Sequence, residues 1–387
     1  MAKLSSSNGI EKFPKLRFPE FKEPWNLVKL EDVCSYRKGR AKVKKAQYIS
    51  TENILQNYAG IEPYDDLSEA EGISIQCGDT LMANIRPYLK KVWQSNFNGA
   101  CSTDVLAFSP DNIDGKFLYF LIAQDRFVNY VMCGAKGSKM PRGDKNHILE
   151  YETGVPTESE QRKIAHFIDL LNARISSQNS LINLIKKYKR GSLSALFPKK
   201  REITPQYRFA GFTKPWEQRK LDDVVEFLDT MRKPLEGAKR ISGSYPYYGA
   251  SGIVDYVDGY LFDEELILLS EDGANITDRN YPVCFLASGK YWVNNHAHVL
   301  RTKQGNENTF ICNSLERKDY TQYNTGMAMP KLNKETCKKI PILCPEFEEQ
   351  KKIGDYFRSL DHLITLHQHK YDTLLSLKNA ILQQMFI

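Results

Sequence analysis

Two long stretches of the chain repeat apolar residues with an alternating spacing of four and three, which places them on one side of a helix. The first stretch follows Pro156, the second follows Pro345, and an offset of 189 residues superimposes them. The pattern predicts two helices of about 40 residues, each about 60 Å long. The seam comprises Ile164, Ile168, Leu171, Ile175, Gln178, Ile182 and Ile185 in the first helix, and Ile353, Phe357, Leu360, Ile364, His367, Tyr371 and Leu374 in the second.

Polar residues interrupt both seams at the same two places, Gln178 with His367 and Lys189 with Lys378. Polar residues in an apolar seam cost stability and fix register, so their repetition predicts that the helices pair with one another. The order domain, helix, domain, helix then requires an antiparallel coiled coil if the halves are related by a pseudo-twofold axis. In the alternative arrangement each helix packs alone on its own domain.

Between the helices, short apolar runs bounded by Gly, Pro, Asn and Asp predict strands, for example residues 105–108 and 266–269. We therefore expect an α+β chain, with two mixed α/β domains related by pseudo-twofold symmetry and joined by the two long helices. The expected boundaries are a tail at 1–12, a first domain at 13–155, a helix at 156–197, a second domain with its linker at 198–344, and a helix at 345–387.

The two halves also share sequence motifs. Residues 17–33 read RFPEFKEPWNLVKLEDV and residues 208–224 read RFAGFTKPWEQRKLDDV, and the motifs MPR and MPK precede the two helices. Each helix then opens with Pro-x-x-x-Glu-Gln-x-Lys-Ile. No register is sustained between residues 34–135 and 225–325, although these segments contain strand-type runs. A duplicated scaffold with diverged middles predicts two binding surfaces for unlike targets, and the alternative is drift in unconstrained loops.

Composition narrows the class of protein. With 41% hydrophobic residues, the chain can form real cores. No apolar run is long enough for a membrane span, and the first residues lack a secretory signal, so we expect a cytoplasmic protein. The eight cysteines include no CxxC pair, which disfavours a zinc site. A formal charge of +7 makes a polyanionic partner plausible.

The sequence contains no pattern typical of catalysis. It lacks the Gly-x-x-x-x-Gly-Lys-Ser/Thr phosphate loop and the Asp/Asn/Ser-Pro-Pro-aromatic tetrapeptide of amine methyltransferases. His296 and His298 share a strand face without a third ligand, so a strand surface is a better interpretation than a metal pair. We therefore predict a binding protein with no catalytic residue, no metal and no cofactor.

Basic and polar segments at related positions of the halves are candidate DNA contacts. Six basic residues crowd one segment of the first half, and cations follow the matching motif of the second half; these would contact phosphates. Polar and aromatic residues elsewhere could reach base edges, although turn chemistry explains them equally well. The candidates are Arg37, Lys38, Arg40, Lys42, Lys44, Lys45, Asn84, Arg86, Lys90, Lys139, Arg142, Arg232, Lys233, Lys239, Arg240, Tyr247, Tyr248, Asn295, His296 and Lys331.

The motif pair, the helix openings and the segments YYGASGIVDYV and LLSEDGANI resemble the specificity subunit of type I restriction–modification systems. The resemblance covers about residues 13–387. It implies two target-recognition domains, each specific for one part of a bipartite double-stranded DNA sequence. It also implies that the coiled coil sets the spacer and docks two methyltransferase subunits, through which restriction subunits join. The family's recognition code does not transfer, because the middles vary.

Two other hypotheses remain open at this point. One is a coiled-coil scaffold for protein partners without specific DNA binding. The other is a self-sufficient methyltransferase or nuclease, which the missing motifs disfavour. Salt dependence separates the first from a DNA-binding subunit, because binding through several phosphates weakens steeply with salt.

Overall fold

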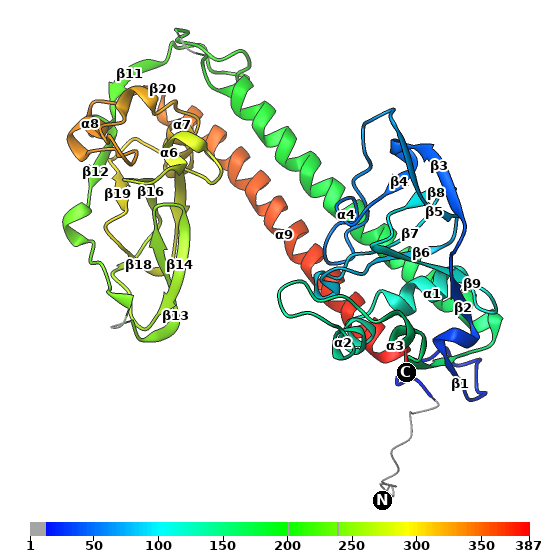
Figure 1. The fold of residues 1–387 in the computed structure, drawn as a ribbon. Helices are drawn as coiled ribbons and strands as arrows, with labels where there is room; N and C mark the ends of the chain where they lie inside the picture. The colour runs from blue at the N-terminus through cyan, green and yellow to red at the C-terminus, as the bar shows by residue number, and fades with distance from the viewer. Residues whose placement is uncertain (1–12, 200, 238–239) are drawn as a thin grey trace, which may run out of the picture. The chain divides into compact units, whose positions relative to one another are not determined.

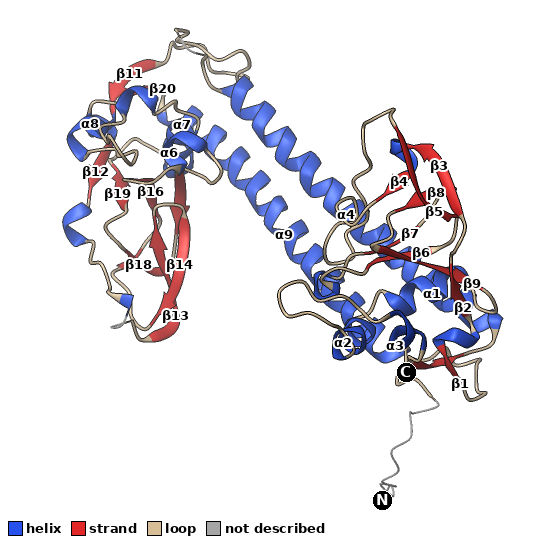
Figure 2. Ribbon diagram, in the orientation of Figure 1, coloured by secondary structure: helices blue, strands red, loops and turns tan. Residues whose placement is uncertain are grey.

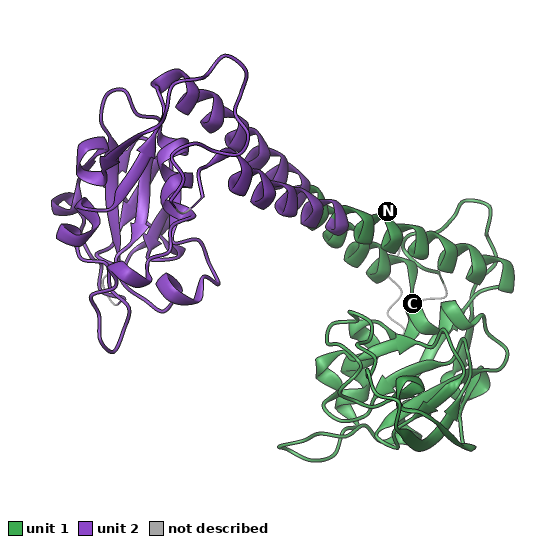
Figure 3. Ribbon diagram, turned by 90° about the horizontal axis from the view of Figure 1, so that it is seen from above, with its two compact units in different colours: residues 1–178, 370–387 green, residues 179–369 purple. Residues whose placement is uncertain are grey.

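The computed structural model describes residues 13–199, 201–237 and 240–387. The chain divides into two compact units, residues 1–178 with 370–387 and residues 179–369 (Figure 3). Each unit contains one domain of strands and short helices and one half of each long helix. Segments from distant parts of the sequence therefore complete each unit.

The domain of unit 1 contains two four-stranded sheets and a two-stranded ribbon (Figures 1 and 2). The first sheet has the order β2 (Cys34–Tyr36), β9 (Val105–Pro110), β6 (Thr80–Ala83), β7 (Val92–Gln94). The second has the order β3 (Arg40–Lys44), β5 (Glu69–Ile75), β8 (Gly99–Cys101), β4 (Tyr48–Ile49). The ribbon pairs β1 (Asn26–Lys29) with β10 (Glu152–Val155). The helical segments are α1 (Gly115–Ile122), α2 (Asp125–Cys133), α3 (Lys145–Leu149) and the 3-10 turns η1 (Leu30–Asp32), η2 (Lys45–Gln47) and η3 (Pro87–Leu89).

The domain of unit 2 has the same kinds of sheet. One has the order β12 (Val225–Phe227), β19 (Ala297–Thr302), β16 (Leu266–Ser270), β17 (Cys284–Ala287). Another has the order β14 (Gly252–Val257), β13 (Ser242–Gly249), β18 (Lys290–Val293), β15 (Phe262–Asp263), and β11 (Glu217–Lys220) pairs with β20 (Pro341–Cys344). The helical segments are α5 (Leu221–Val224), α6 (Asn275–Asp278), α7 (Asn308–Glu316), α8 (Lys334–Lys338), η4 (Asp229–Met231) and η6 (Thr321–Tyr323).

The long helices are α4 (Glu158–Leu196) and α9 (Phe347–Met385). In unit 1 the start of α4 packs with the end of α9, since Ile164 and Ile168 share a buried cluster with Ile381. In unit 2 the end of α4 packs with the start of α9, where Lys189 Nζ lies 2.6 Å from Asp361 Oδ1. The helices are therefore antiparallel, as predicted, and neither packs alone on its own domain. Every predicted seam residue is buried or half-buried, and the predicted α+β class is confirmed.

The repeated motifs fasten each domain to the helix pair. Arg17 donates two hydrogen bonds of 2.7 Å to the carboxylate of Glu160, whose side chain is 1% exposed. Arg208 makes the same bidentate pair with Glu349 in unit 2, where the Nε–Oε1 distance is 2.8 Å. Gln161 and Gln350 follow these two glutamates. The side-chain oxygen of each glutamine accepts a hydrogen bond from the backbone at the start of a short helix, and its side-chain nitrogen donates one to the carbonyl of the proline before its own long helix. The Glu-Gln of the helix opening is thus a structural clamp.

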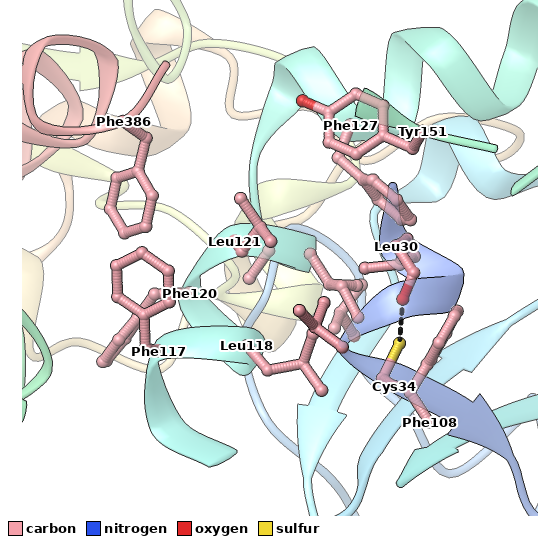
Figure 4. Packing of buried hydrophobic residues seen from close by; sticks show 14 of the residues in the cluster. Leu30, Cys34, Phe108, Phe117, Leu118, Phe120, Leu121, Phe127, Tyr151 and Phe386 are labelled. Atoms are coloured by element: carbon pink, nitrogen blue, oxygen red, sulfur yellow. Dashed lines mark hydrogen bonds between the residues drawn. The ribbon is translucent and has the colours of Figure 1, made fainter. Parts of the chain in front are cut away.

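An aromatic cluster completes the attachment in unit 1 (Figure 4). Phe386, which follows α9, stacks on Phe117 of α1 with ring centroids 5.2 Å apart, and Trp25 meets Phe117 edge-on at 6.1 Å. In unit 2 Phe197 after α4 stacks on Phe310 at 5.2 Å, with Trp216 edge-on at 5.5 Å. Burial of such rings stabilises each domain on the helix that arrives from the other half of the sequence.

Candidate nucleic-acid interface

Three loops of unit 1 meet at one end of the sheet formed by β6 and β9. Asn84, which follows β6, donates its N–H to the carbonyl of Asp104, which precedes β9, at 2.8 Å. Arg86 donates its N–H to the carbonyl of Pro141 at 2.8 Å, and the N–H of Gly143 points to the carbonyl of Asn84 at 3.4 Å. The loops 84–91, 102–104 and 135–143 therefore form one connected surface, which we call loop cluster 1.

Unit 2 repeats this backbone arrangement. Glu271 donates its N–H to the carbonyl of His296 at 2.9 Å, Gly273 to Pro330 at 3.0 Å, and Leu332 to Glu271 at 2.7 Å. These three bonds are the counterparts of the three bonds in unit 1. We call the loops 271–283, 294–296 and 324–332 loop cluster 2. Isolated bridges also correspond, with Ile85 opposite Arg142 in one unit and Asp272 opposite Lys331 in the other.

The Met-Pro-basic motif forms the tip of each loop cluster. In unit 1, Lys136 and Arg142 exchange two backbone hydrogen bonds of 2.9 Å and close the loop that contains the motif. In unit 2 the N–H of Thr325 donates to the carbonyl of Lys331 at 2.8 Å. Gly326 fits there because a Cβ would stand 1.8 Å from the carbonyl oxygen of Met329. These closures leave Met140 and Met329 exposed by 50% and 60%.

The side chains on the two matching backbones differ. In loop cluster 1, Arg142 Nη1 lies 3.2 Å from Asp104 Oδ1, and Arg86 is exposed in the left-handed region with φ of 52°. Asn84 is 9% exposed, and its Oδ1 is buried without a hydrogen-bond partner. Lys139 is exposed. This cluster therefore presents the guanidinium groups of Arg86 and Arg142 and the carboxylate of Asp104, while the amide oxygen of Asn84 is buried.

In loop cluster 2, His296 Nδ1 lies 2.9 Å from Asp272, while Lys331 Nζ lies 3.6 Å from Glu271. Asn295 is exposed beside them. This cluster offers imidazole, amide and carboxylate groups in place of the guanidinium groups of unit 1.

A buried charged network supports loop cluster 2. His298 is 1% exposed, with Nδ1 2.8 Å from Asp229 and Nε2 2.7 Å from the carbonyl of Leu332, so both ring nitrogens face acceptors. Burial alone would raise the pKa of Asp229, but the hydrogen bond and charge of His298 and the charge of Arg232 outweigh it and hold that pKa below its ordinary value. Arg232 donates to Glu271 at 2.7 Å and to the carbonyl of Ala297 at 2.7 Å. Arg232 therefore stabilises the loops from within the domain, and it is not among the residues that we propose to contact DNA.

The basic segment of the first half lies mainly on β3, where it faces acidic residues. Arg40, Lys42 and Lys44 alternate to one exposed face of this edge strand. Lys42 stands opposite Glu71 and Lys44 opposite Glu69 on β5. Lys45 pairs with Asp66 at 3.0 Å, and Arg37 is held by Asp79 at 2.9 Å through two bonds. Arg40 also pairs with Glu71 at 3.4 Å, so these acids compensate part of the positive charge, while Lys38, Lys42 and Lys44 have no ion pair among the described residues.

Three other predicted contacts of unit 2 pack against side chains of the domain. Tyr247 is 1% exposed, and its hydroxyl accepts a hydrogen bond from the N–H of Leu235. Tyr247 is therefore a core residue, and we do not propose it as a DNA contact. Tyr248 is half-buried against Phe285 and Tyr291. Arg240 packs over the Tyr247 ring and bonds to Asp255.

Three further cations were among the predicted contacts, and one of them, Lys90, belongs to loop 84–91 of loop cluster 1. Lys233 is exposed, and its carbonyl accepts from Trp292. Lys90 pairs with Asp125 at 2.8 Å. Lys239 lies outside the described residues.

The exposed methionines of the two tips were not among the predicted contacts, although the repeated Met-Pro-basic motif points to them. Asp104, which lies in loop 102–104 and pairs with Arg142, was not among them either. Within residues 13–199, 201–237 and 240–387, no cluster of three or more potential ligands could hold a metal ion. None of the helices in these ranges combines the length and apolarity needed to cross a membrane.

The comparisons with known proteins agree with this architecture. The sequence matches the family model described as type I restriction modification DNA specificity domain twice, at residues 22–187 and 213–376. A type I restriction enzyme specificity subunit of Haemophilus influenzae is 37% identical over 137 residues, which is 35% of either chain. The MjaVIII specificity subunit of Methanocaldococcus jannaschii is 21% identical over 96% of this chain and 94% of its own.

Solved structures share the fold over nearly the full length. The crystal structure of a type I restriction-modification S subunit from M. genitalium superimposes with a TM-score of 0.65 at 15% identity, covering 97% of this chain and 99% of that one. A chain from a study of complex assembly and conformational transition of the type I R-M system gives 0.57 at 18% identity, covering 94% and 98%. The chain therefore belongs to the type I restriction-modification DNA specificity family, as a non-catalytic specificity subunit with two target-recognition domains.

Proposed function

We propose that each loop cluster contacts one half of a bipartite double-stranded DNA target. The observation that carries this proposal is the pair of matching loop backbones with unlike side chains. A common backbone presents residues at equivalent positions in both halves, and different donors and acceptors there select different bases. The equivalent cations Arg142 and Lys331 would contact phosphates, which hold the protein in place without specifying sequence.

The proposed contact residues fall into two classes, those that select bases and those that contact phosphates. Asn84, Arg86 and Asp104 in unit 1, and Asn295, His296 and Asp272 in unit 2, would determine base preference. Lys139, together with the exposed cations Lys38, Lys42 and Lys44, would add phosphate contacts at the edge of domain 1, reduced by Glu69 and Glu71.

Methylation mapping in cells that express the chain with its cognate methyltransferase tests the assignment. The expected result is one bipartite, asymmetric methylated motif. Replacing residues 34–135 with the corresponding segment of another specificity subunit should change one half-site and leave the other unchanged. A change in both halves, or in neither, would contradict the assignment of one domain to one half-site.

The helix pair of unit 2 carries an exposed apolar face that supports docking of a methyltransferase subunit. When the buried seam is assigned to heptad positions a and d, Leu181, Tyr188 and Leu363 occupy g, while Leu184 and Leu366 occupy c. In an antiparallel pair the g positions of both helices lie on the same side. These five side chains are between 37% and 62% exposed, which is unusual for aligned apolar residues unless a partner covers them.

In this proposal the chain binds two methyltransferase subunits, restriction subunits join through them, and the length of the helix pair sets the unread spacer. The competing function is a scaffold without specific DNA binding. A filter-binding titration between 50 mM and 200 mM salt distinguishes the two. A sequence-specific complex should lose affinity steeply with salt, whereas the scaffold would show no preference for the mapped motif at any salt concentration.

A further inference from the structure

A cavity of unit 1 holds a lysine that lacks the partner found at the equivalent position of unit 2. Lys189 and Lys378 are equivalent seam residues. In unit 2, Lys189 pairs with Asp361 at 2.6 Å. The residue of unit 1 that corresponds to Asp361 is Asn172, which has no charge. Lys378 has no ion pair or hydrogen bond with any described residue, and burial lowers the pKa of its ammonium group.

The cavity beside Lys378 has a volume of about 750 Å³ and lies between α9, α2 and the loops at Tyr58 and Lys90. Its apolar side is formed by Phe120, Leu382 and Phe386. Helix α2 forms one wall, and the corresponding part of unit 2 has the short turn η6 instead. The cavity is therefore specific to unit 1 and is not part of the scaffold that the two halves share.

The charge of the cavity favours an anion. Lys90 is compensated by Asp125, whose carboxylate also accepts from the hydroxyl of Tyr58 at 3.2 Å. Lys378 and Arg126 remain without a carboxylate partner among the described residues. A half-buried ammonium without a counterion is costly, and an incoming carboxylate removes that cost.

We propose that this cavity receives an Asp or Glu side chain of the methyltransferase subunit that docks on the helix pair, which makes the two docking sites of the chain unequal. This inference rests on the proposed function. The apolar side of the cavity favours a carboxylate carried by a protein segment over a free anion or a phosphate. Leu377 of unit 1, which is 49% exposed and occupies a g position beside Lys378, is the equivalent of Tyr188 in the apolar face of unit 2.

Zero-length carbodiimide cross-linking of the assembled complex tests the contact directly. The expected product is an amide between Lys378 and an Asp or Glu of the methyltransferase subunit, identified by peptide mass spectrometry. Lys189 in the same sample is the internal control, and it should cross-link to Asp361 of its own chain. Cross-links of Lys378 to residues of its own chain alone would overturn the proposal.

Three variants of the full chain separate this contact from general effects on assembly. Asn172→Asp supplies the internal partner that unit 2 has, so it should weaken one of two methyltransferase sites by roughly ten- to hundredfold in calorimetric titration, as should Lys378→Met. Lys189→Met is the matched control and should leave both sites within about threefold. Thermal unfolding of each variant verifies that the chain stays folded.

The possible failures are distinguishable. If the wild-type chain binds no methyltransferase subunit, the proposed function itself is wrong. If it binds two subunits and neither Asn172→Asp nor Lys378→Met changes the affinity, only the cavity assignment is wrong. A loss of DNA affinity at unchanged methyltransferase affinity would assign Lys378 to a phosphate contact and would also overturn it.

Discussion

At the residue scale, the buried carboxylates Glu160 and Glu349 depend on one arginine each. The side chain of Glu160 is 1% exposed and that of Arg17 is 13% exposed, so the pair is largely shielded from water. Arg17→Ala would leave a buried charge without a partner, and we expect it to lower the free energy of unfolding of unit 1 by about 3 kcal/mol. Urea unfolding followed by tryptophan fluorescence measures the loss. The double variant Arg17→Met/Glu160→Leu should recover most of it, and no recovery would mean that the arginine acts by other contacts.

The network around Asp229 predicts a pH dependence for unit 2. Because the pKa of Asp229 is lowered in the folded chain, its contribution to stability is present above the ordinary pKa of 3.8. That contribution is lost as the pH falls through the lower, folded-state value. Unit 2 should therefore lose stability in strong acid, and Asp229→Asn should reduce this pH dependence while lowering stability at neutral pH. Calorimetry between pH 2 and pH 7 tests both effects, and an unchanged profile in the variant would count against this assignment.

The sequence shows where basic residues stand but not which acidic residues pair with them. Arg232 is held by Glu271, which is 39 positions away, and Arg37 by Asp79, which is 42 positions away. Neither separation follows from a helical or strand period, so the sequence could not distinguish supporting arginines from free ones. The burial of Tyr247 could not be predicted for a similar reason, because a tyrosine in a polar, glycine-rich segment is compatible with a surface or a core position.

At the scale of elements, regular elements were predictable and loops were not. The helices were expected at 156–197 and 345–387, and the structure has them at Glu158–Leu196 and Phe347–Met385. Their seam follows from a repeat of seven, which the side chains must obey to share one buried face. The loop clusters depend on backbone bonds between three separate segments, for which no local pattern exists.

The tip of loop cluster 2 provides a test at this scale. Gly326→Ala would place a methyl group against the carbonyl of Met329, so the backbone around the motif must shift. We expect a loss of DNA affinity of about tenfold with little change in global stability, because the tip is exposed. Gly237→Ala is a matched control, since no atom of the described residues lies within 4 Å of its Cβ position. An equal loss of affinity in both variants would show that the tip does not contact DNA.

At the scale of the whole molecule, the proposed role of the helix pair in setting the spacer can be tested by shortening both helices together. Residues 175–181 and 364–370 are equivalent heptads of α4 and α9, and deleting both preserves the seam and its register. Each helix shortens by about 10 Å at 1.5 Å per residue, which corresponds to at most about three base pairs of 3.4 Å. We expect methylation mapping to show a shorter spacer between unchanged half-sites, since neither loop cluster is altered. Deleting only one heptad would offset the seam and should prevent stable pairing. If the double deletion remained active with the original spacer, the helix pair would not set the spacing, and the distance between half-sites would have to be fixed by the partner subunits.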